Sequence, residues 1–220
     1  MVFYFRPRLH GLPGASNDDW LIYMGRDKFE NETLLANALP VDIWFHVDDL
    51  SSAHVYLRLP KDATVDAIPA DTLEDCCQLV KANSIEGCKR TKVNIVYTPA
   101  SNLKKTGNMV TGQVGYHDVK IVKEYRVEKS NEIVNRLNKT KQELFPDLEA
   151  EKNAWLEART RERRDQAKEQ KRREKAEREE AMRTKELLSY DRIMDSDDMV
   201  TNKELKEKYQ SVEDWEDDFM

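Results

Sequence analysis

The sequence has few cysteines and glycines and no long apolar run. Only three cysteines occur in 220 residues, and Cys76 and Cys77 are adjacent. An odd number of cysteines, two of them adjacent in sequence, does not suit the disulfide framework of a secreted domain, so we expect a reducing compartment. No segment approaches the roughly 18 apolar residues of a membrane span, and Arg6 places a charge too early for a signal peptide. The expected location is therefore the cytosol or the nucleus.

Charge is spread unevenly along the chain. The formal net charge is −6, from 36 basic and 42 acidic residues. Residues 1–150 carry 19 basic and 21 acidic residues, residues 151–186 carry 13 and 10, and residues 187–220 carry 4 and 11. The corresponding net charges of −2, +3 and −7 argue against a globally basic nucleic-acid binder. Any basic binding surface must be local.

The first 127 residues alternate short strand-like runs with turns around one clear helix. Period-two alternation predicts strands at residues 42–47 and 53–59, joined by a hairpin loop at 48–52. Other strand-like runs stand at residues 2–5, 21–24, 92–98 and within 112–127. Apolar residues at helical spacing predict a helix between Pro69 and Gly87, with both adjacent cysteines on its buried stripe. We therefore expect an α+β domain, a compact mixture of sheet and helix, over residues 1–127.

The hydrophobic period becomes helical after this domain. We expect a long charged helical arm over residues 128–190 with a kink near 145–146, because Pro146 interrupts a run of strong helix formers. Pairs such as Glu169 and Arg173 stand four residues apart and support the helix. An apolar coiled-coil seam is nearly absent between Leu156 and Leu187, which favours a solvated single helix and a monomer. The oligomeric state, and whether the helix docks on protein or membrane, stay open.

The last 30 residues, 191–220, are acidic. We expect disorder there, except that residues 202–209 could form a short helix.

The alternation in the predicted hairpin separates its side chains into two faces. If the apolar set faces the core, the opposite face gathers rings and a guanidinium. Its members are Trp44, His46, His54, Tyr56 and Arg58. Aromatic planes beside a cation suit base stacking and phosphate contact, so we predict a solvent-exposed nucleic-acid-binding surface. Later residues add to it: Lys92, Asn94, Thr98, Lys104 and Lys105. The alternative is that Trp44 and Tyr56 are core residues of a sheet covered on both sides.

Patterns for catalysis or metal binding are weak. His46 and His54 could share a metal, but no carboxylate or thiolate stands at a matching spacing. The sequence shows no phosphate-binding loop and no supported pair of catalytic carboxylates. We expect a protein that is not an enzyme and that carries no cofactor and no metal.

An ordered set of motifs resembles the NFACT-R domain family. The matching segments are Met24–Glu32, Asp42–Val47, Ser51–Arg58, Ile68–Asp75, Val96–Pro99, Asn102–Lys105 and Gly112–Tyr116. The likeness covers about residues 1–127. The similarity of this chain to a small eukaryotic member of the family extends through Phe145–Leu148, the charged helix and the terminal Asp-Phe-Met.

The resemblance implies a non-catalytic RNA-binding module. Larger relatives carry this domain in ribosome-associated quality control, where they contact tRNA and the large ribosomal subunit, so tRNA or rRNA and the ribosome are the implied partners. The family motifs place these residues at the RNA surface: Arg26, Asn31, Trp44, His46, His54, Arg58, Lys104 and Lys105. Asp42 is expected to orient its neighbours. In the arm, Lys171, Arg172 and Arg173 are expected to add backbone contacts.

Other hypotheses remain beside RNA binding. The chain could be a protein-interaction scaffold that acts through the helix and the acidic tail. DNA could bind the same surface, because no residue visibly reads a 2′-hydroxyl. The weakest hypothesis is a metal-dependent nuclease that uses His46 and His54.

Overall fold

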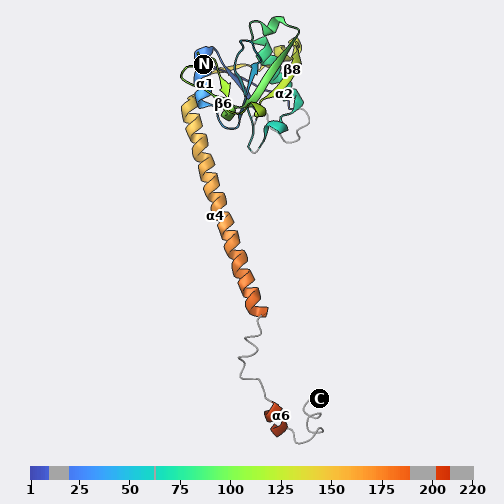
Figure 1. The fold of residues 1–220 in the computed structure, drawn as a ribbon, viewed down its shortest axis with the longest axis vertical. Helices are drawn as coiled ribbons and strands as arrows, with labels where there is room; N and C mark the ends of the chain where they lie inside the picture. Colours follow the sequence, from blue (N-terminus) through green and yellow to red (C-terminus); the bar gives the residue numbers. More distant parts are fainter. Residues whose placement is uncertain (10–19, 62, 189–201, 209–220) are drawn as a thin grey trace. The chain divides into compact units, whose positions relative to one another are not determined.

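The computed structural model describes residues 1–9, 20–61, 63–188 and 202–208 (Figure 1). The chain divides into two compact units, Met1–Ala158 and Arg159–Met220. The first unit contains the sheet and the helices that cover it. The second contains most of the long helix α4 (Leu148–Leu188) and the short helix α6 (Asn202–Lys208). Helix α6 stands where a short helix was predicted, and the rest of the tail expected to be disordered lies outside the described residues.

A seven-stranded antiparallel sheet forms the centre of the first unit. Across the sheet the strands are β8 (Lys123–Glu128), β5 (Lys92–Pro99), β3 (Asp42–Val47), β4 (Val55–Arg58), β2 (Leu21–Gly25), β1 (Val2–Phe5) and β9 (Gln142–Leu144). A separate ribbon pairs β6 (Leu103–Lys104) with β7 (Gly115–Tyr116). The predicted hairpin is confirmed, because β3 and β4 pair antiparallel with Trp44 opposite Tyr56.

The sheet is covered on both faces. Helices α2 (Ala70–Ala82) and α3 (Asn131–Lys139) cover the face that carries Ile43, Phe45 and Leu57, and Cys76 and Cys77 are fully buried there. Helix α1 (Lys28–Asn37), on the other side of the sheet in Figure 1, packs on the opposite face together with β6 and β7. The α+β class is thus confirmed, with two apolar layers rather than one.

Short 3-10 helices connect several of these elements. They are η1 (Val65–Ala67), η2 (Gly87–Lys89), η3 (Ala100–Asn102) and η4 (Val119–Ile121).

Helix α1 begins directly after β2 and lies close to it. The Asp27 carboxylate caps the helix by accepting hydrogen bonds from the backbone N–H groups of Phe29 (2.9 Å) and Glu30 (3.0 Å). These bonds lower the pKa of Asp27 below its usual value. Gly25 leaves the space that the first turn needs, because a Cβ there would stand 2.6 Å from Asn31 Oδ1.

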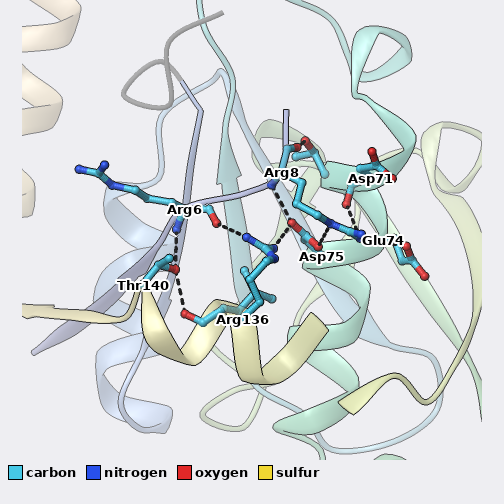
Figure 2. Close-up of polar contacts among 9 residues, drawn as sticks. Arg6, Arg8, Asp71, Glu74, Asp75, Arg136 and Thr140 are labelled. Atoms are coloured by element: carbon cyan, nitrogen blue, oxygen red, sulfur yellow. Dashed lines mark hydrogen bonds and ion pairs between the residues drawn. The ribbon is translucent and has the colours of Figure 1, made fainter. Parts of the chain in front are cut away.

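A buried carboxylate fastens the segment after β1 between α2 and α3. Figure 2 shows Asp75 of α2 between the side chains of Arg8 and Arg136. Asp75 is fully buried, accepts from Arg8 N (2.8 Å) and Arg8 Nε (2.9 Å), and forms an ion pair with Arg136. Arg136 also donates to the Arg6 carbonyl oxygen (3.2 Å). This network joins α3 to the first unit, because the Asp75 carboxylate forms ion pairs with both Arg8 and Arg136.

The compact unit extends beyond the domain boundary predicted at residue 127. Residues 131–139 form α3, whose Leu137 is fully buried against the sheet, and residues 142–144 form β9 beside β1. A strand therefore stands where a continuous arm with a kink near 145–146 was expected. The first unit extends to Ala158 and includes the start of α4.

Candidate nucleic-acid interface

The predicted row of polar and aromatic side chains does lie on one face of the sheet. Antiparallel pairing sets Asp42 opposite Arg58 and Trp44 opposite Tyr56, and the ring of Trp44 stacks on that of His46 at 5.3 Å. However, the expectation that this face is open to solvent was wrong. Trp44 is 1% exposed, His54 2% and Tyr56 0%, because α1 and the segment between β6 and β7 cover them. The alternative of a sheet covered on both sides is correct for these rings.

Arg58 is engaged inside the protein and does not point freely to a phosphate. Its Nε donates to the buried carboxylate of Asp42 at 3.1 Å, and its guanidinium lies 5.2 Å from the ring centre of Tyr23. Asp42 also accepts from the Tyr23 hydroxyl (2.6 Å) and from the Leu39 N–H (2.7 Å). Asp42 therefore orients its neighbours, as predicted. Arg58 reaches toward α4 as well, where Glu151 lies 3.6 Å away.

Residues 105–114, between β6 and β7, form a cover that we call the lid segment. Lys105 ties it down: its ammonium donates to Glu32 Oε1 of α1 (2.7 Å) and to two carbonyl oxygens of the lid itself, those of Val110 and Gln113 (both 2.9 Å). The N–H of Gly112 donates to the same Glu32 oxygen at 2.6 Å. Lys105 is thus a latch in this structure, which corrects its assignment as an open phosphate contact.

The two histidines beneath the lid are held in the neutral form. Burial, and secondly the neighbouring His46, lower the pKa of His54 to about 4. Burial also lowers the pKa of His46, which is half-buried. His54 Nε2 lies 3.1 Å from the carbonyl oxygen of Gly112, so Nε2 carries the proton and Nδ1 is an acceptor. A neutral ring here offers hydrogen bonds rather than charge.

Polar atoms beneath the lid lack partners. Among the residues that the structure describes, five buried side-chain atoms have no hydrogen-bond partner. Four of them lie between this face of the sheet and its cover: Asn31 Oδ1 on α1, and Trp44 Nε1, His54 Nδ1 and the Tyr56 hydroxyl on the sheet side. A buried polar group left without a partner costs about 1–3 kcal/mol, and native proteins contain few of them. Four such atoms are therefore concentrated in one layer of the first unit. Asn31, expected at an open RNA surface, is itself only 8% exposed.

Exposed cations stand on the elements that cover this buried layer. Arg26 and Lys28 are exposed at the start of α1, and Lys28 stands one helical turn before Glu32. Lys104 is exposed at the edge of the lid, next to the latch residue Lys105. Two of the predicted cations, Arg26 and Lys104, are therefore exposed, and so is Lys28, which the sequence reasoning passed over. Its position inside the first family motif was the available signal.

The remaining predicted contacts belong to other elements. Lys92 of β5 forms an ion pair with Glu128 of β8. In α4, Arg172 and Arg173 lie 3.5 Å from the carboxylate of Glu169, and with Lys171 they remain exposed to solvent. Helix α4 buries none of its residues, which agrees with the predicted solvated helix.

The described ranges contain no group of three or more histidine, cysteine, aspartate or glutamate side chains placed to hold a metal ion. Nor does any helix in these ranges combine the length and apolar character that crossing a bilayer requires.

Comparison with known proteins agrees with the resemblance seen in the motifs. Residues 1–118 match the family model of the NFACT protein RNA binding domain. The chain is 52% identical over 205 residues to coiled-coil domain-containing protein 25 of Bos taurus, a match that covers 93% of this chain and 96% of that protein. The namesake from Danio rerio is 58% identical over 166 residues, 75% of each chain. Protein JLP2 of Saccharomyces cerevisiae is 38% identical over 157 residues, covering 70% of this chain and 74% of that protein. The chain therefore belongs to the NFACT RNA-binding domain family, and its similarity to these relatives extends beyond the domain into the charged helix.

Proposed function

We propose that this protein is a non-catalytic RNA-binding protein that meets RNA with the cations around the lid segment. The observation that carries the proposal is the match of residues 1–118 to a family of RNA-binding domains. Physical support comes from three exposed cations: Arg26 and Lys28 at the start of α1, and Lys104 beside the lid. Cations contact phosphate without reading sequence, so the binding is general in sequence and dependent on salt.

The RNA partner in this proposal is tRNA or rRNA, in association with the ribosome. A structured RNA suits the surface, because the exposed cations can contact its phosphate backbone without reading its sequence. Lys171, Arg172 and Arg173 of α4 supply further backbone contacts.

The test is a filter-binding titration of the full chain with RNA at several salt concentrations. Replacing both Arg26 and Lys104 by Ala should weaken binding by roughly tenfold at physiological salt and reduce the salt slope by about 2, one for each lost phosphate contact. Competition with DNA of the same sequence tests whether this surface binds RNA in preference to DNA.

The matched control is Lys89→Ala. Lys89 is an exposed lysine of η2, which lies against the sheet face covered by α2, so its loss should leave affinity nearly unchanged. Equal affinity and equal salt slope for the wild type and the double variant would contradict the proposed surface.

A further inference from the structure

The unpartnered atoms beneath the lid segment belong to neighbouring residues. Trp44 and Tyr56 face each other across β3 and β4, and the His54 ring centre lies 5.4 Å from that of Trp44. Asn31 lies beside Gly25 at the end of β2. Because Met24 pairs with Val55, Gly25 stands next to His54 on the neighbouring strand. The four side chains thus share one layer between the sheet and its cover.

These atoms form a mixed set of two donors and two acceptors. The indole N–H of Trp44 and the hydroxyl of Tyr56 can donate, while Asn31 Oδ1 and His54 Nδ1 accept. Each group is neutral, and each belongs to a side chain at most 8% exposed. A single ligand that satisfies all four must carry donors and acceptors together, and the cost of burying a charge favours a neutral one.

The surrounding surface is aromatic. The rings of Trp44 and His46 are stacked with an angle of 5° between their planes, and His54 meets both at nearly a right angle. Flat rings of this kind bind another flat ring by stacking or by edge contact. Neutrality, planarity and a mixed hydrogen-bonding edge are together the properties of a nucleobase.

Few polar contacts hold the lid segment in place, and Val114 is the one residue in its described range that packs against the apolar cluster beneath it. One half-buried ion pair, Lys105 with Glu32, and the hydrogen bonds of Gly112 hold the lid segment on α1 and on His54. The side chains of this pair are 29% and 31% exposed, so solvent partly screens their attraction. Gly112 adopts φ +86°, and a Cβ at either Gly107 or Gly112 would meet nothing within 4 Å. The lid backbone therefore has space around its two glycines.

We propose that the lid segment opens to admit one unpaired nucleobase of bound RNA, which then hydrogen-bonds to Trp44, His54 and Tyr56. This inference rests on the proposed function, since the cations around the lid bring the RNA to the site. A base in a duplex is stacked and paired, so the site selects single-stranded segments, loops or ends.

The experiment compares the full chain binding to a single-stranded RNA and to the same sequence in a duplex. The wild type should prefer the single strand. Tyr56→Phe removes one oxygen and should weaken single-strand binding about fivefold, the equivalent of one hydrogen bond of about 1 kcal/mol, while duplex binding is unchanged. Tyr125→Phe, a matched change on the other face of the sheet, should alter neither affinity.

A second variant tests the lid without touching the rings. Glu32→Gln removes the ion pair with Lys105 and should raise affinity for the single strand more than for the duplex. Thermal unfolding of each variant confirms that it is folded.

The outcomes separate the two proposals. If neither RNA binds, the proposed function fails. If both RNAs bind equally and Tyr56→Phe changes nothing, RNA binding stands but the nucleobase site is refuted, and the unpartnered atoms then hold buried water only.

Discussion

Protonation of His54 makes the stability of the protein depend on pH. Its pKa is about 4 in the folded protein against an ordinary 6.5, chiefly because burial disfavours the charged ring. Between these values the unfolded chain binds more protons than the folded one. The contribution of His54 to stability is therefore complete above pH 6.5 and is lost as the pH falls toward 4.

We predict that the free energy of unfolding decreases by roughly 3 kcal/mol over this window because of His54. Urea unfolding at intervals between pH 7 and pH 4 measures it, with His54→Gln for comparison. The variant should lose less stability on acidification than the wild type. Parallel curves for the two proteins would assign the pH dependence to other groups.

Individual residues of the site could be placed on a face from sequence but not beneath a cover. Period-two alternation put Trp44, His54 and Tyr56 on one side of the hairpin correctly, since successive strand residues point to opposite faces. It could not decide exposure, because this depends on α1 and the lid segment, which lie elsewhere in the chain. The roles of Arg58 and Lys105 were missed for the same reason: their carboxylate partners, Asp42 and Glu32, meet them only through the tertiary fold.

Helix α1 shows how one glycine sets the distance between two elements. A Cβ at Gly25 would lie 2.6 Å from Asn31 Oδ1 and 3.1 Å from Asn31 N, so Gly25→Ala must displace the first turn of the helix from β2. We expect a loss of about 1–3 kcal/mol in the free energy of unfolding, the usual cost of overpacking.

Gly107→Ala is the matched control for this change, because the added methyl group would meet nothing within 4 Å. It should leave stability unchanged or raise it slightly by restricting the unfolded chain. Urea titration of both variants measures the difference. A Gly25→Ala protein as stable as Gly107→Ala would show that the close approach is not required.

Elements with a clear period were predicted well, and those without one were missed. The strand at 42–47 and the helix after Pro69 agree with the structure, because their apolar residues recur at the spacing of a strand or a helix. Helix α1 was not predicted, since its only buried residues are Asn31 and Leu34. Strand β9 has three exposed residues and is recognised only by its pairing with β1.

At the scale of the whole molecule, the family domain and the compact unit do not coincide. The family match ends at residue 118, whereas the first unit extends to Ala158. The residues after 118 complete the first unit. Helix α3 packs against α2, and β9 extends the sheet. Lys152 at the start of α4 donates to the Ala36 carbonyl oxygen at the end of α1 (2.6 Å). The residues after the family domain are therefore needed by its core.

This organisation predicts how truncated chains behave. A fragment of residues 1–158 should unfold cooperatively with the stability of the first unit in the full chain, because α4 buries none of its residues. A fragment of residues 1–127 loses Ile133 and Leu137, whose burial contributes about 1.5–3 kcal/mol each, and leaves Asp75 without Arg136. The sum approaches the entire stability of a small domain, so the shorter fragment should lack a cooperative transition. Circular dichroism during urea titration distinguishes the two, and equal midpoints would mean that the core is complete at residue 127.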